Sequence, residues 1–201
     1  MSKPEVVVFD LGKVLVDFDY SLVAKRLKAR STADIGAVAA RLDQSTLLIE
    51  YETGRISTDE FFAQIRKLTG YTGTLDEFAV AFGDIFSPIE EMIEWQATLK
   101  SRDVPTFIFS NTNELAVRHI TSAFPFFGGF NHYIYSHEIG SMKPAAKIYE
   151  AVEAATNRSG KQILYIDDKI ENIEGGRSRG WHTIHHVTPR ETLTEAAVHG
   201  F

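Results

Sequence analysis

Apolar residues gather in five short runs along the chain, each rich in β-branched or aromatic side chains. Continuous apolar runs of this length are typical of strands that are buried within a sheet. Helical patterns follow the second, third and fourth runs, and this alternation predicts a parallel sheet with crossover helices. The expected strands are Val6 to Phe9, Thr106 to Phe109, Tyr133 to Tyr135, Ile163 to Ile166 and Thr183 to Val187.

The connection after the first strand is unusual, because 78 residues separate that strand from Pro88, far more than a crossover needs. Capping boxes predict helix starts at Ser57 and Thr74, since each hydroxyl and the carboxylate three residues later satisfy free backbone N–H groups. Apolar residues then recur on one helical face, which predicts a small helical bundle. These residues are Phe61, Phe62, Ile65 and Leu68 after the first box, and Leu75, Phe78, Phe82 and Ile85 after the second.

A carboxylate, Asp10, directly follows the first expected strand. Open α/β sheets bind their ligands at the carboxyl ends of parallel strands. Gly12 would let the backbone turn sharply and approach a ligand closely. An aspartate in this place can bind a cation or act as a nucleophile. Taken alone, it fits a helix cap or a loop residue equally well.

Polar residues also follow the second expected strand, namely Ser110, Asn111, Thr112 and Asn113. Thr112 or Asn113 could cap the next helix. The same helix start offers free N–H groups to an anion, so that both uses can coexist.

Lys143 and Pro144 follow the third expected strand. Proline suits the first turn of a helix, here expected over residues 145–155. Lys143 would then stand at a helix start, where the macrodipole disfavours a cation. This position suggests an anion nearby, with a solvated lysine as the alternative.

The fourth expected strand ends in the adjacent carboxylates Asp167 and Asp168, with Asn172 one helical turn later. Adjacent carboxylates in a partly buried cleft repel each other unless a cation compensates. Only oxygen and amide ligands are on offer, which suits Mg²⁺, although an acidic helix start is the simpler alternative. Together, the strand-end residues suit phosphoryl transfer, with cations and N–H groups neutralising phosphate charge while Asp10 attacks phosphorus.

Composition narrows the class of protein. With 201 residues, 44% of them hydrophobic and 24% charged, the chain suits a soluble domain with a sizeable core. The net charge of -6 argues against a nucleic-acid-binding surface, but not against a small anionic ligand. No apolar run is long enough to span a membrane, and the chain start shows no signal-peptide pattern. The absence of cysteine excludes disulfides and thiolate metal sites, and fits a cytoplasmic protein.

Four motifs, in order along nearly the whole chain, resemble those of the haloacid dehalogenase superfamily of hydrolases, in its phosphatase branch. They are Phe9-Asp10-Leu11-Gly12-Lys13-Val14, Phe109-Ser110-Asn111-Thr112, Met142-Lys143-Pro144 and Asp167-Asp168-Lys169-Ile170-Glu171-Asn172. The segment from Glu52 to Ser57 in the insert also resembles the small-capped sugar-phosphate phosphatases of this superfamily.

The resemblance implies an α/β fold with a Rossmann-like three-layer core, residues 1–15 and 87–201, and a parallel sheet of strand order 3-2-1-4-5. It also implies a helical-bundle cap, residues 16–86, over the site. The implied activity is that of a Mg²⁺-dependent phosphatase, acting on a small phosphorylated metabolite such as a sugar phosphate through a phospho-aspartyl intermediate on Asp10.

By motif match, the implied catalytic residues are Asp10 as nucleophile, with Lys143 and Ser110 holding the phosphoryl oxygens. The implied substrate-binding residues are Ser110, Asn111, Lys143 and Asn172, the last of which orients this shell. The implied Mg²⁺ site consists of Asp10, the carbonyl of Gly12, Asp168 and Asp167. The resemblance makes Asp168 the closer metal ligand, with Asp167 ordering a metal-bound water.

One position departs from the pattern, because most phosphatases of this superfamily carry a second aspartate, as general acid and base, where this chain has Gly12. A missing acid should slow the reaction by roughly 10²–10⁴ where the leaving oxygen needs a proton. Anomeric and aryl leaving groups need it less. Asp17, Asp19 and Lys13 are the candidate replacements, although each also fits a surface or capping role.

Two alternative functions remain. In a 2-haloacid dehalogenase the same aspartate would attack carbon, and Arg41 could bind the halide. Gly12 stands where related dehalogenases have an aromatic residue, however, and Asp167 with Asp168 would repel the substrate carboxylate without a cation. A non-catalytic binding protein of this fold is the second alternative. It leaves unexplained why the chain keeps charged groups that are costly without an anion and a metal.

Overall fold

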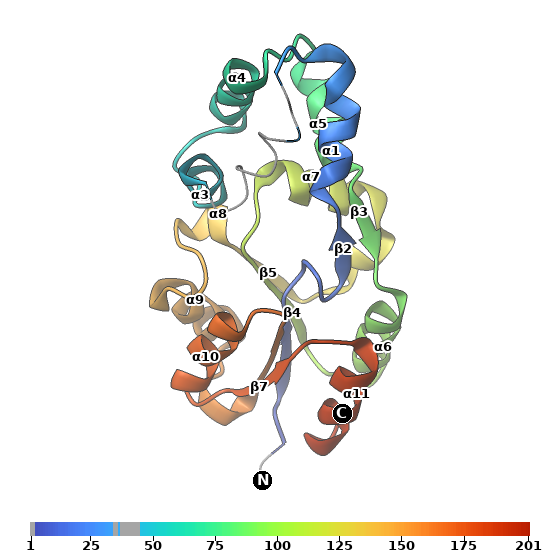
Figure 1. Ribbon diagram of the computed structural model, residues 1–201. Coiled ribbons are helices and arrows are strands. Elements are labelled where there is room, and N and C mark those ends of the chain that lie inside the picture. The colour runs from blue at the N-terminus through green and yellow to red at the C-terminus, as the bar shows by residue number, and fades with distance from the viewer. Residues whose placement is uncertain (1–2, 34–35, 37–44) are drawn as a thin grey trace.

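The computed structural model describes residues 3–33, 36 and 45–201. At its centre is a five-stranded sheet in which all neighbouring strands are parallel (Figure 1). The strands follow the order β5-β4-β1-β6-β7, which confirms the predicted order 3-2-1-4-5. Their bounds are β1 (Val6–Phe9), β4 (Thr106–Ser110), β5 (His132–Tyr135), β6 (Ile163–Asp167) and β7 (His182–His185).

Helices cover both faces of the sheet and give the core its three layers (Figure 1). On one face, Val7 and Phe9 of β1 pack in a cluster with residues of α6, α7 and α11. On the other, Val6 and Val8 pack with residues of α9 and α10, because successive side chains of a strand point to opposite faces. The helices are α6 (Glu90–Ser101), α7 (Glu114–Ala123), α8 (Ser136–Ile139), α9 (Ala146–Thr156), α10 (Ile170–Ser178) and α11 (Pro189–Val198), with short η2 (Pro125–Gly129) and η3 (Gly160–Gln162).

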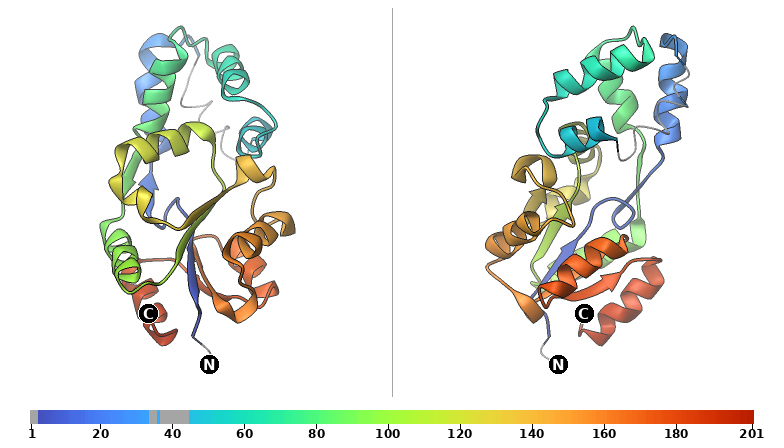
Figure 2. Two further views of the ribbon diagram at one scale, coloured as in Figure 1. Left: turned by 180° about the vertical axis from the view of Figure 1, so that it is seen from behind. Right: turned by 60° about the vertical axis from the view of Figure 1, so that its left-hand side comes forward.

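The segment between β1 and α6 forms a separate layer of helices, outside the three layers of the core and at one end of it (Figure 2). Among the described residues, its helices are α1 (Tyr20–Leu27), η1 (Lys28–Arg30), α3 (Thr46–Glu52), α4 (Thr58–Thr69) and α5 (Leu75–Gly83). Both predicted capping boxes are present, at Ser57 and at Thr74. The helices share an aromatic core of their own, which also takes in Leu115 of α7. We refer to this layer as the cap; its expected limits at residues 16 and 86 stay a prediction.

The cap joins the core through a short antiparallel ribbon that the sequence analysis did not anticipate. Strand β2 (Val16–Phe18) pairs with β3 (Phe86–Pro88), so that Phe18 lies opposite Phe86. Each strand has only three residues, too few for a recognisable alternation.

One residue of the predicted apolar face is placed wrongly. Leu68 is 52% exposed, whereas Thr69 is buried together with Phe61 and Ile65. The buried positions Phe61, Ile65 and Thr69 of α4 are thus spaced four residues apart. The hydroxyl of Thr69 donates a hydrogen bond to the Ile65 carbonyl, so that this buried polar group has a partner. None of the helices among the described residues is both long and apolar enough to cross a membrane.

Candidate active site

The strand-end residues named from the sequence meet at the carboxyl edge of the sheet. Asp10 follows β1, Ser110 ends β4, and Asp167 ends β6 with Asp168 next to it. Asp10, Ser110 and Asp167 are buried, while Asp168 is only half-buried. This convergence follows from the parallel sheet, which brings the ends of neighbouring strands to one edge.

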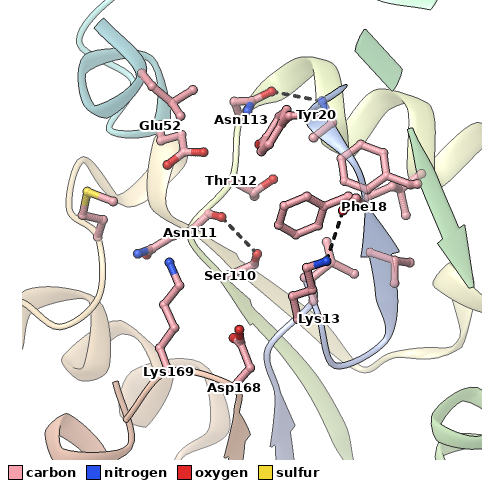
Figure 3. A pocket seen from close by; sticks show the side chains of 18 of the residues that line it. Lys13, Phe18, Tyr20, Glu52, Ser110, Asn111, Thr112, Asn113, Asp168 and Lys169 are labelled. Atoms are coloured by element: carbon pink, nitrogen blue, oxygen red, sulfur yellow. Dashed lines mark hydrogen bonds between the residues drawn. The ribbon is translucent and has the colours of Figure 1, made fainter. Parts of the chain in front are cut away.

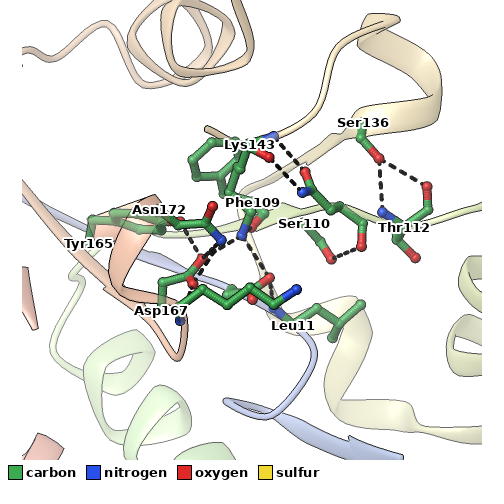
Figure 4. A network of polar contacts seen from close by, with 12 residues as sticks. Leu11, Phe109, Ser110, Thr112, Ser136, Lys143, Tyr165, Asp167 and Asn172 are labelled. Carbon is green, nitrogen blue, oxygen red and sulfur yellow. Dashed lines mark hydrogen bonds and ion pairs between the residues drawn. The ribbon is translucent and has the colours of Figure 1, made fainter. Parts of the chain in front are cut away.

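A single lysine, Lys143, links two of these carboxylates, those of Asp10 and Asp167, and Figure 4 shows it beside Asp167. The Nζ of Lys143 lies 2.9 Å from Oδ1 of Asp10 and 2.6 Å from Oδ2 of Asp167. It also donates to the carbonyl of Phe109 at 2.9 Å, so that its three N–H donors are all engaged. Lys143 is only 4% exposed, which rules out the solvated alternative.

Lys143 does not stand at the start of a helix, which corrects the expectation that a helix macrodipole acts on it. Helix α9 begins at Ala146, its N-cap is Ala145, and Pro144 precedes that cap instead of occupying the first turn. Lys143 is therefore not at the helix start, and the macrodipole does not govern it. Its buried ammonium is offset directly by two carboxylates.

Three carboxylates and one lysine meet at this site, so that negative charge exceeds positive charge in a region with little access to water. Burial raises the pKa of Asp10 to about 7. The charge of Lys143 lowers this pKa, whereas the charges of Asp167 and Asp168 raise it further. Burial and the neighbouring Asp167 likewise raise the pKa of Asp168. Burial alone would raise the pKa of Asp167 as well, but the charge and hydrogen bond of Lys143 lower it. An additional cation beside Asp10 and Asp168 would lower the energy of their charged forms.

The two adjacent aspartates have different environments. Asp167 is 0% exposed, and its carboxylate accepts hydrogen bonds from Lys143, the hydroxyl of Tyr165, the Lys169 N–H at 2.8 Å and the Asn172 amide at 3.0 and 3.2 Å. Asp168 instead lines a cavity. Both of them, with Asp10, offer oxygens that lie within 4.8 Å of one another, which fits a hard cation that prefers oxygen ligands.

The residues after β4 mainly position other groups. The amide of Asn111 donates to the Lys143 carbonyl at 3.1 Å and accepts from the Lys143 N–H at 2.7 Å. This reciprocal pair fixes the loop that carries Lys143. Asn113 caps α7 by accepting from the Ala116 N–H, as predicted for Thr112 or Asn113.

A cavity of about 670 Å³ opens above the carboxylates, between core and cap (Figure 3). Its polar lining includes Lys13, Glu52, Ser110, Asn111, Thr112, Asn113, Asp168 and Lys169. Its apolar lining includes Phe18, Tyr20, Ile49, Phe86 and Met142. Neither Lys169 nor this apolar lining was expected at the site from the sequence, although Lys169 directly follows the aspartate pair.

All three candidates for the missing acid already interact with neighbouring groups. Asp17 forms an ion pair with Lys13, and this hydrogen bond lowers the pKa of Asp17, which keeps it ionised. Asp19 caps α1 by accepting from the Ser21 N–H at 2.8 Å. Lys13 is the one of the three that lines the cavity.

Comparison with known proteins places this geometry in a family. The model of the family described as haloacid dehalogenase-like hydrolase matches residues 4–180. The chain is similar to D-ribitol-5-phosphate phosphatase of Bacteroides thetaiotaomicron, at 27% identity over 88% of this chain and 89% of the relative. It is also similar to a sesquiterpene phosphatase of Aspergillus oryzae, at 23% identity over 95% of this chain and 94% of the relative.

A similar fold occurs in a solved structure of a family enzyme from Bacteroides thetaiotaomicron in complex with magnesium and inorganic phosphate. The TM-score is 0.80 at 21% identity, covering 90% of this chain and 93% of that one. At this identity the likeness supports the fold.

We expect Lys143→Met to destabilise the fold by about 3–5 kcal/mol, because it leaves Asp10 and Asp167 buried without their cation. Urea unfolding in a buffer free of divalent cations measures the change. Lys169→Met is the matched control, since Lys169 is exposed beside the same cluster and should alter stability little. Equal losses in the two variants would show that the ion pair does not hold the site together.

Proposed function

The chain belongs to the haloacid dehalogenase-like hydrolase family, and from this premise we propose that it is a Mg²⁺-dependent phosphatase of small phosphomonoesters. One observation carries the proposal: three carboxylates and a buried lysine converge beside a cavity of ligand size, and one of these carboxylates, Asp168, lines it. Two relatives that are similar to this chain are named as phosphatases, which supports it. Their names refer to a polyol phosphate and to a sesquiterpene, and so leave the alcohol open.

In the proposed reaction, Asp10 attacks phosphorus. Its Oδ1 accepts from the Leu11 N–H at 2.7 Å and pairs with Lys143, which leaves Oδ2 for the attack. A bond forms between this oxygen and phosphorus while the bond from phosphorus to the alcohol oxygen breaks, and the alcohol leaves with the bonding electrons and takes up a proton. Water then attacks phosphorus, releases phosphate and restores Asp10.

The neighbouring residues have proposed roles that follow from their contacts. The positive charge of Lys143 offsets the negative charge of a phosphate bound next to Asp10. The hydroxyl of Ser110, which lines the cavity, donates a hydrogen bond to a phosphoryl oxygen. Asn111 positions Lys143, and Asn172 positions Asp167 through its amide. These contacts favour positioning roles for both asparagines over direct substrate binding.

The donor set suits Mg²⁺, since it consists of oxygens. We propose Asp10, Asp168 and the carbonyl of Gly12 as Mg²⁺ ligands. Asp167 is not among them, because its carboxylate already accepts hydrogen bonds from Lys143, Lys169 and Asn172. When bound, Mg²⁺ would neutralise charge on the phosphoryl oxygens. A cytoplasmic location, expected from the cysteine-free composition, stays a prediction.

Asp10→Asn should abolish hydrolysis of p-nitrophenyl phosphate, because an amide is a poor nucleophile. Chelation of divalent cations should stop the unmodified enzyme, and added Mg²⁺ should restore it. Asp76→Asn, which alters an exposed residue in the first turn of α5, is the control and should remain active. An active Asp10→Asn variant would refute the nucleophile. Halide release from a 2-haloacid without phosphatase activity would favour the dehalogenase alternative.

The two adjacent aspartates should separate metal binding from stability. Asp168→Asn should weaken Mg²⁺ binding, measured by calorimetry, by at least about tenfold, with little loss of stability. Asp167→Asn should instead lower the free energy of unfolding by about 3–5 kcal/mol, because Lys143 loses a buried partner. The reverse pattern would make Asp167 the metal ligand.

The rate should depend steeply on the leaving group, because Gly12 provides no carboxylate to protonate the departing oxygen. We expect kcat for aryl and anomeric sugar phosphates to exceed that for hexose 6-phosphates by about 10²-fold or more. Aspartyl-phosphate should also accumulate, since the attacking water lacks a base, and rapid quenching would detect it. Hexose 6-phosphates as the best substrates would show that another residue, with Lys13 the first to mutate, supplies the proton.

A further inference from the structure

The apolar lining of the cavity faces the space beside the carboxylates. Phe18, Tyr20, Ile49, Phe86 and Met142 are all half-buried, so that part of each side chain is open to a ligand. Figure 3 shows the rings of Phe18 and Tyr20 on one side of the cavity and Asp168 at its floor. We call Phe18, Tyr20 and Phe86 the aromatic wall.

The aromatic wall is held in place by the ribbon between core and cap. Phe18 and Phe86 are direct partners across β2 and β3, and their ring centroids lie 6.1 Å apart. Tyr20 packs edge-on against Phe18 at 5.2 Å. The Nζ of Lys13 lies 4.6 Å from the centroid of the Phe18 ring. These contacts restrict the Phe18 ring from several directions.

The Phe18 ring also fills the place of the missing carboxylate. A Cβ added at Gly12 would lie 2.9 Å from Cε1 of Phe18, closer than two carbon atoms normally approach. Any side chain at position 12 therefore competes with this ring. Two residues from the nucleophile, the leaving group would meet a hydrocarbon surface where an acid might otherwise stand.

We propose that the enzyme selects phosphomonoesters of apolar alcohols, whose hydrocarbon part packs on the aromatic wall. This inference rests on the proposed phosphatase function. A polyol would lose hydrogen bonds to water against this wall, whereas a hydrocarbon chain gains by leaving water.

A series of n-alkyl phosphates tests the wall separately from leaving-group chemistry, because ethyl, butyl and hexyl phosphate are all primary alkyl esters. We expect KM to fall by up to about fourfold for each added methylene, with kcat nearly constant. Ribitol 5-phosphate should have a KM well above that of hexyl phosphate. A KM that ignores chain length, or a lower KM for ribitol 5-phosphate, would overturn the proposal in favour of a polyol substrate.

Variants assign the effect to the wall. Phe86→Ser should flatten the dependence of KM on chain length, while Val80→Ser, at an apolar cap residue that is 68% exposed, should not. Ile49→Ser offers a second test on the cap side should Phe86→Ser fail to fold. A slope that is unchanged in every folded wall or cavity variant would refute the assignment.

Binding distinguishes this proposal from the phosphatase function itself. Calorimetry with the Asp10→Asn protein compares hexyl phosphate with ribitol 5-phosphate when no turnover occurs. If hexyl phosphate binds more tightly but the unmodified enzyme releases phosphate from no ester, the apolar site is supported and the phosphatase is refuted. If the unmodified enzyme releases phosphate but ribitol 5-phosphate binds more tightly, the phosphatase is supported and the apolar site is refuted.

Discussion

The site depends on one buried interaction, in which the ammonium of Lys143 lies between the carboxylates of Asp10 and Asp167. A buried charge is costly unless paired, and removing one partner leaves the others uncompensated. The pairing therefore requires the ends of β1 and β6 and the loop before α9 to come together. Asn111 holds that loop from β4, so that four segments distant in the chain are fixed by a few polar contacts.

The same interaction explains why two adjacent aspartates are not equivalent. Asp167 is turned into the protein, where its donors balance its charge, while Asp168 remains at the cavity with its charge only partly offset. One lysine cannot balance three carboxylates, and the deficit is what makes the floor of the cavity suitable for a hard cation and then for a phosphate.

The cap contributes through the ribbon that joins it to the core. Because β2 pairs with β3, Phe18 and Phe86 stand together beside Gly12, and the Phe18 ring occupies the space of a side chain at that position. The departure of the first motif from the family pattern and the aromatic lining of the cavity are thus one structural feature. The absence of a carboxylate and the presence of an apolar surface would act on the same part of the substrate, the leaving alcohol.

Local patterns in the sequence were sufficient to locate the five strands of the central sheet, the capping boxes and the strand-end residues, because each depends on neighbouring positions and parallel strands end at one edge. The last strand is displaced, since β7 spans His182–His185 and not the expected Thr183 to Val187. The motif resemblance added the strand order, which the structure confirms. Only the tertiary structure decided that Lys143 is buried between carboxylates, that Asp167 faces inward, that Leu68 is exposed and that Phe18 stands over Gly12. The charge environments and the pairing of β2 with β3 depend on contacts between segments far apart in the chain, and no local periodicity encodes such contacts.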